Sequence, residues 1–131
     1  MNSTLFKMLI ILSSLVSCDA KKSIQKEIKK DKIKITWYEE SYISNRRAFV
    51  TVENNDKNDV VLDCNDLSII DINMNNDTIF IKIFEPVKTV IYSFKNSFEG
   101  YPIKIDSCYS INEYNKIYQP EYYKPSGASA Q

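Results

Sequence analysis

Apolar and polar residues alternate along most of the chain from Ile33 onward. Ile33 and Ile35 flank a lysine, and similar stretches with a period of two follow as far as Ser107. A period of two is typical of a β-strand that buries one face. The pattern predicts strands over 33–37, 48–53, 60–64, 68–74, 78–84, 89–94 and 101–107.

Clusters of Asn and Asp separate several of these strands. One cluster covers residues 54–59, and Asn75-Asn76-Asp77 divides two strands that we therefore expect to form a hairpin. Asn and Asp suit turns because they tolerate the left-handed backbone. We find no convincing long amphipathic helix. About seven short strands at this spacing predict an all-β fold, a small antiparallel β-sandwich or barrel.

The first 18 residues follow a different pattern. Lys7 precedes an apolar run from Met8 to Val16, and a small residue precedes Cys18. This is the layout of a secretory signal, and the run is shorter than the ~20 residues that span a bilayer. Leu15-Val16-Ser17-Cys18 also resembles the lipobox of bacterial lipoproteins. The resemblance implies cleavage before Cys18, acylation of its thiol by a chain such as palmitate, and anchoring in the cell envelope.

The alternatives are an ordinary secretory signal with an incidental cysteine and a short membrane anchor. If the chain is acylated, Asp19 resembles the inner-membrane retention signal of enterobacteria. The abundance of Ile, Lys, Asn and Tyr fits an AT-rich genome. Bacteria with such genomes often belong to other phyla, in which an aspartate at this position is not a retention signal. We therefore expect the outer membrane rather than the inner one.

Residues 18–32 are highly charged after Cys18. Their only large apolar residues are Ile24 and Ile28, too few to offset the entropy of ordering the segment. We expect a solvated tether, with a basic helix lying on anionic lipid as the alternative. The expected organisation is thus a signal peptide (1–17), an acylated cysteine with its tether (18–32), a β domain (33–118) and a flexible tail (119–131).

Two cysteines remain once Cys18 is assigned to lipid. In an exported chain, Cys64 and Cys108 are expected to form a disulfide. Such a bond would close a loop of about 45 residues and contribute roughly 4 kcal/mol in the chain-entropy treatment. The alternative is a pair of buried free thiols.

The composition excludes several kinds of catalytic and ligand-binding site. The chain has no histidine and only two glycines, so it lacks the commonest general base and the material for a phosphate-binding loop. It carries 17 basic and 17 acidic residues, and cleavage before Cys18 would remove only Lys7 from this balance. A nucleic-acid partner would require a clear basic excess, which is absent.

Carboxylates are the remaining candidates for catalysis or metal binding. Glu39-Glu40, Glu53, Asp63 and Asp66 show no spacing that indicates a known mechanism. Asp71 to Asp77 resembles the first half of an EF-hand loop, but Asn76 replaces its glycine and Lys82 replaces its bidentate glutamate. We therefore expect that the protein is not an enzyme and that it binds no cofactor and no metal ion.

Aromatic residues are the remaining candidates for recognition. Tyrosines at the C-terminal end either cover the open end of the sandwich or form a binding surface, because tyrosine is enriched at binding hot spots. The candidate binding residues are Trp37, Tyr109, Tyr114, Tyr118 and Tyr122.

By elimination, we expect a non-catalytic module that binds a protein partner through a sheet face, an edge strand or the tyrosine-rich segment. Small lipoprotein inhibitors of lysozyme are similar in general plan, which suggests an inhibitor or immunity-type role. The alternative is an accessory lipoprotein that captures a sugar or a peptide, with Trp37 and the tyrosines lining a groove.

Overall fold

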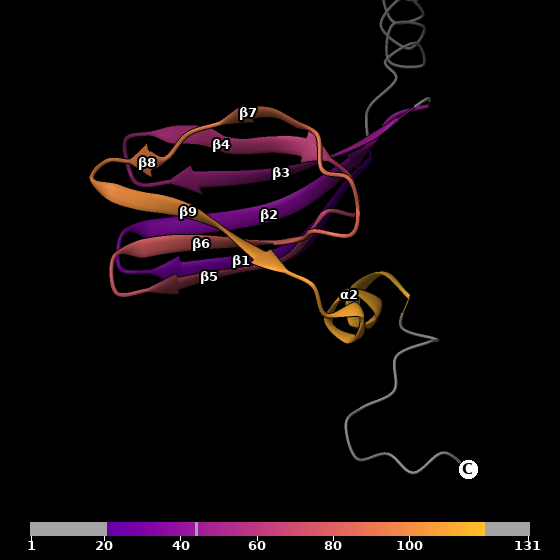
Figure 1. Cartoon of the computed structure of the whole chain (residues 1–131). Helices are drawn as coiled ribbons and strands as arrows, with labels where there is room; N and C mark the ends of the chain where they lie inside the picture. The colour runs from indigo at the N-terminus through magenta and orange to yellow at the C-terminus, as the bar shows by residue number, and fades with distance from the viewer. Residues whose placement is uncertain (1–20, 44, 120–131) are drawn as a thin grey trace, which may run out of the picture.

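The computed structural model describes residues 21–43 and 45–119, which form a two-layer β-sandwich and one short helix (Figure 1). The strands and the helix are β1 (Lys21–Lys30), β2 (Ile33–Ser41), β3 (Arg46–Glu53), β4 (Asn58–Asn65), β5 (Ile69–Asn75), β6 (Thr78–Phe84), β7 (Ile91–Phe94), β8 (Ser97–Phe98), β9 (Tyr101–Cys108) and α2 (Ile111–Tyr118).

The strands form two sheets. Sheet A has the order β1-β2-β3-β4-β7, and sheet B has the order β5-β6-β9-β8. The predicted all-β sandwich is confirmed, and the described residues form nine strands rather than about seven, without a closed barrel. One pair departs from the expected antiparallel arrangement, because β6 and β9 run parallel. Between them the chain crosses to sheet A and forms β7 there.

The core lies between the sheets, where alternate residues of each strand meet. Ile35, Val50 and Leu62 project from sheet A and are fully buried. Ile72 and Ile81 do the same from sheet B. The period of two that predicted the strands therefore reflects this shared interior.

The predicted hairpin between residues 68 and 84 is confirmed. Strands β5 and β6 pair antiparallel as far as Asn75 and Thr78, and Asn76 occupies the left-handed region with φ 55°. The turn between β8 and β9 also needs a left-handed backbone. Glu99 and Gly100 have φ values of 47° and 83° there, a pair of positive values that favours glycine in a two-residue hairpin loop.

The segment predicted as a tether is instead mostly a strand, which corrects the expected domain boundary. Strand β1 pairs with β2 from Lys21–Ser41 to Lys30–Ile33 and forms one edge of sheet A. Most of its side chains are exposed, but Ile28 packs against the core. An edge strand needs little apolar surface of its own because the neighbouring strand supplies the buried face, so composition alone was misleading.

Helix α2 follows β9 and packs on the outer surface of sheet B near the end of the sandwich. Ser110 caps the helix, and its hydroxyl accepts a hydrogen bond from the backbone N–H of Glu113 at 3.3 Å. The ring of Tyr114 stacks on Phe84 with 4.4 Å between the ring centroids. Among the described residues, no helix has the length and apolar character needed to cross a bilayer.

Candidate functional site

The two long sides of the sandwich differ. On one side β1 and β5 face each other across the sheets, and side chains of β1 bridge them. Lys26 forms an ion pair with Asp71 at 2.7 Å, and the Lys30 ammonium donates to the Asn76 carbonyl oxygen at 3.1 Å. The opposite side is bounded by β7 of sheet A and β9 of sheet B, and it is less completely closed.

Strand β7 exposes apolar side chains along an unpaired edge. All four of its residues are exposed, including Ile91 at 44%, Tyr92 at 56% and Phe94 at 38%, and none of the four is charged. Native edge strands are usually protected by charged side chains, as β1 is by its lysines. An apolar edge without that protection is typical of an interaction surface.

A cleft of about 540 Å³ opens between β7 and β9. Its apolar wall comes from Ile83 of β6, Ile91 of β7 and Ile105 of β9, and Glu85, Pro86, Lys88 and Thr89 of the crossover close one end. The cleft therefore lies beside the core, although Ile83 itself is only 3% exposed. We call Ile83, Ile91, Tyr92, Phe94 and Ile105 the open flank.

The backbone of β9 is also available along the open flank. The N–H of Ile103 donates to the Asn96 carbonyl oxygen at 2.8 Å, on the side of β9 away from β6. Since backbone groups alternate in direction along a strand, those of Ile105 and Ser107 point to the same side. Strand β8 pairs with β9 only at Tyr101 and Pro102, so no described strand occupies this stretch of edge.

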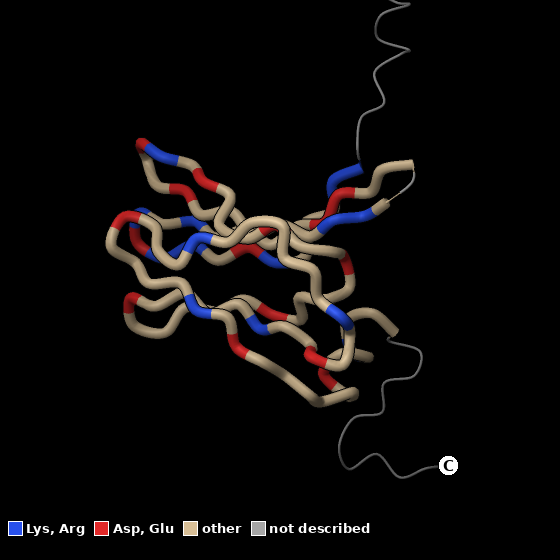
Figure 2. The backbone as a smooth tube through the Cα atoms, turned by 45° about the horizontal axis from the view of Figure 1, so that its top comes forward, with Lys and Arg blue, Asp and Glu red and all other residues tan. Residues whose placement is uncertain are grey.

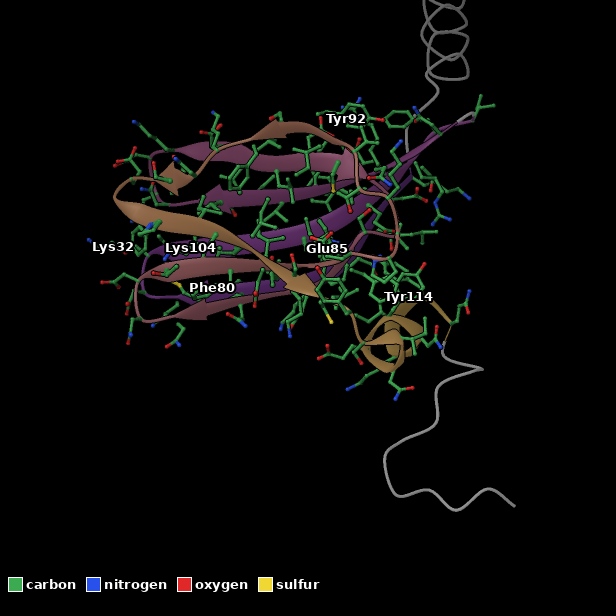
Figure 3. All side chains as sticks on the ribbon, viewed as in Figure 1. Lys32, Phe80, Glu85, Tyr92, Lys104 and Tyr114 are labelled. Carbon is green, nitrogen blue, oxygen red and sulfur yellow. The ribbon has the colours of Figure 1, made fainter. Side chains whose placement is uncertain are left out.

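Arg47 fixes the position of the most exposed ring on the open flank. Its guanidinium donates two hydrogen bonds to Asp63, from Nε at 3.0 Å and from Nη2 at 2.6 Å. The same guanidinium lies 4.2 Å from the centroid of the Tyr92 ring. This cation–π contact orders an exposed tyrosine before any partner binds. Figure 3 shows Tyr92 on β7 and Glu85 near the end of β9.

Most aromatic residues singled out in the sequence do not form a binding surface. Trp37 is only 3% exposed and belongs to the core, so it cannot line the groove that the alternative function required. Tyr114 is buried against Phe84, and the Tyr118 hydroxyl donates to the Ile69 carbonyl oxygen. These two rings cover the end of the sandwich, as the first alternative predicted. Tyr109 is 74% exposed, and Tyr122 lies outside the described residues.

The expected disulfide is wrong. Cys64 and Cys108 are both free and buried. Cys64 belongs to the core between the sheets, whereas Cys108 belongs to the smaller cluster with Ile70, Phe84 and Tyr114. Burial raises the pKa of the Cys64 thiol to about 12, and burial together with its bond to Glu113 raises the pKa of Cys108. Neither is therefore an activated nucleophile. Cys18 lies outside the described residues.

Glu39 is an unusual buried carboxyl group in this structure. It is 4% exposed and lies 3.7 Å from the Arg46 guanidinium. Burial raises the pKa of Glu39, while Arg46 opposes that change. The Tyr118 hydroxyl lies 3.4 Å from Glu39, so helix α2 shields the carboxyl group from solvent. Among the described residues, no three His, Cys, Asp or Glu side chains gather in a way that would hold a metal ion.

Comparison with known proteins finds no matching family, no similar curated protein and no similar solved structure for this chain.

The open flank was missed in the sequence because the predicted strand over 89–94 came with no position in a sheet. Val90, Tyr92 and Phe94 alternate along one face, which predicted a strand but not an edge. In the structure β7 is short and lies at the edge of sheet A. The alternation carries no information about strand order. A possible signal was the absence of charge between Lys88 and Lys95, which is unusual for an edge strand.

Proposed function

We propose that this chain is a lipid-anchored protein of the bacterial envelope that binds a protein partner along the open flank. The anchor is proposed on the resemblance of Leu15-Val16-Ser17-Cys18 to a lipobox. The observation that carries the binding role is the uncharged edge strand β7 beside a cleft that reaches Ile83 and Ile105.

The partner that best suits this surface presents an extended segment. Such a segment can pair with the unoccupied backbone edge of β9 and place an apolar side chain in the cleft between Ile91 and Ile105. Strand addition uses main-chain hydrogen bonds for affinity and side-chain pockets for specificity. Tyr92, ordered by Arg47, supplies a rigid aromatic contact of the type found at binding hot spots.

Within this class, we propose an inhibitor or immunity-type role without catalysis. A compact domain held at a membrane would meet toxins or lytic enzymes that enter the envelope. The proposal of a sugar-binding groove loses its support because Trp37 and Tyr114 are buried. The alternative role, capture of a small ligand, keeps its support only for a peptide. A peptide would bind along the same open flank.

Photo-crosslinking in the native cells tests this proposal. Tyr92 or Phe94 is replaced by a photoreactive phenylalanine analogue in the full chain, and Tyr109 is replaced in the same way as an exposed control. We expect a discrete protein adduct from positions 92 and 94, lost when Ile91→Asp is added, and none from position 109. Adducts of equal yield from all three positions, or none from the flank, would contradict the proposed site.

A further inference from the structure

The tip of the β2–β3 hairpin carries an apolar side chain that the fold does not use. Ile43 is 95% exposed and Tyr42 is 46% exposed, and the Tyr42 N–H donates a hydrogen bond to the Asn45 carbonyl oxygen at 2.7 Å. Figure 2 shows this hairpin projecting from the body of the sandwich. A single exposed isoleucine is unremarkable in itself. Its position relative to Cys18 gives it significance.

The chain leaves no room for a long spacer between the proposed anchor and this hairpin. Strand β1 begins at Lys21, three residues after Cys18, and Lys21 pairs with Ser41 at the base of the tip. Three residues extend over about 10 Å at most, at roughly 3.3–3.6 Å per residue. An acylated Cys18 would therefore hold the tip close to the membrane surface.

The charges around the tip suit an anionic surface. Lys21 and Lys22 form no ion pair with a carboxylate among the described residues, and Lys22 lies 4.1 Å from the centroid of the Tyr38 ring. Arg46 is also exposed at 53% of its side chain, although it lies 3.7 Å from both Glu39 and Asp66.

One acidic side chain at the tip is already engaged. The Tyr42 hydroxyl donates a hydrogen bond to the Glu40 carboxylate, and Tyr42 directly precedes Ile43 in the chain. Tyrosine is enriched at the membrane–water interface because its ring is apolar and its hydroxyl is polar. The tip thus combines an apolar end, an amphipathic ring and basic residues at its base. These match, in the same order, the acyl chains, the headgroup region and the anionic phosphates of a bilayer surface.

We propose that the hairpin tip docks into the membrane interface beside the acyl anchor. Ile43 enters the boundary of the acyl chains, Tyr42 lies at the level of the headgroups, and Lys21 and Lys22 contact anionic phosphates. This inference rests on the proposed acylation of Cys18. The second contact fixes the orientation of the sandwich, because one acyl-linked residue alone would leave the domain free to rotate.

Fluorescence quenching by brominated lipid tests this docking. The full chain is expressed in a host that processes lipoproteins, isolated from membranes, and reconstituted in vesicles of phosphatidylcholine with phosphatidylglycerol. Ile43→Trp reports on the tip, and Asn55→Trp reports on the exposed turn at the opposite end of β3. The wild-type chain contains only Trp37, which is buried in the core.

Brominated acyl chains should quench the emission that Ile43→Trp adds to the wild type, with a shift of that emission to shorter wavelength. Asn55→Trp and the wild type should be unaffected. Adding Lys21→Gln and Lys22→Gln should reduce the quenching in vesicles that contain phosphatidylglycerol and should have little effect in phosphatidylcholine alone.

A parallel measurement separates this inference from the proposed anchor. Mass spectrometry of the isolated chain establishes whether Cys18 is acylated. An acylated protein in which Ile43→Trp is not quenched, or is quenched no more than Asn55→Trp, would overturn the docking and leave the anchor standing. A chain without acylation would overturn the anchor and the docking together.

Discussion

At the scale of single residues, the least expected feature is the polar contact beneath helix α2. Tyr118 is four residues from Tyr114 on the helix, and its hydroxyl reaches Glu39 of β2 and the Ile69 carbonyl oxygen of β5. The contact joins both sheets to the C-terminal helix. Burial and the nearby Glu39 raise the pKa of Tyr118, so its hydroxyl remains protonated and donates.

Tyr118→Phe should therefore destabilise the domain although the ring remains. The substitution leaves the Ile69 carbonyl oxygen without its donor, at an expected cost of about 1–2 kcal/mol in the free energy of unfolding. Tyr109→Phe is the matched control, because Tyr109 is 74% exposed and should not change the stability. Chemical denaturation of the two variants makes the comparison, and equal midpoints would argue against the contact.

Glu39 predicts a specific dependence of stability on pH. Because burial raises the pKa of Glu39 in the folded state above its ordinary value of 4.5, the folded state binds the proton more tightly than the unfolded state does. The associated stabilisation is present below pH 4.5 and is lost as the pH rises through the folded pKa. Ionised Glu39 is therefore a cost at neutral pH.

Glu39→Gln removes that cost and keeps a side chain of the same size. We expect the variant to be more stable than the wild type at neutral pH, by an amount on the order of 1 kcal/mol. The difference should shrink as the pH falls and should vanish in acid. Thermal melts across this range measure it, and a variant that is less stable at neutral pH would show that the Arg46 contact outweighs the burial.

At the scale of elements, β1 shows what local composition could not predict. The strand is charged because it is an edge, and only Ile28 packs against the core while Ile24 stays 59% exposed. A bulge between Ile24 and Lys26 changes the register between these two isoleucines. Their spacing of four residues suggested a helical face, whereas the pairing with β2 assigns them different environments.

The two isoleucines provide a direct test of β1 as a strand. Ile28→Asp should destabilise the sandwich by roughly 1–3 kcal/mol because it places a charge against the core. Ile24→Asp should have almost no effect. In a solvated tether neither position would matter, so equal stabilities of the two variants would contradict the pairing. Denaturant midpoints of both, measured beside the wild type, decide the question.

Other elements show where sequence reasoning succeeds and where it fails. The β5–β6 hairpin was predictable because its turn and its alternation are local properties of residues 68–84. The parallel pairing of β6 with β9 was not predictable. No residue near either strand indicates that the chain crosses to sheet A between them. The proposed bond between Cys64 and Cys108 failed for the same reason, because residue spacing does not tell which cluster each thiol joins.

At the scale of the whole molecule, the two long sides of the sandwich differ. The Lys26–Asp71 pair bridges the β1–β5 side, whereas a cleft lined by Ile83, Ile91 and Ile105 lies along the open flank. The candidate binding surface was only partly predictable. An edge strand was one of the expected modes, but the tyrosines chosen at positions 114 and 118 serve packing.

The proposed anchor would determine what the open flank can meet, because it would set the compartment in which the domain works. The central proposal is therefore acylation at Cys18. Metabolic labelling with a fatty-acid probe tests it most directly, comparing the wild type with Cys18→Ser. We predict that the wild type takes up the probe and fractionates with membranes, while Cys18→Ser does neither. Label retained by Cys18→Ser, or an unlabelled wild type with an intact N-terminus, would contradict the account.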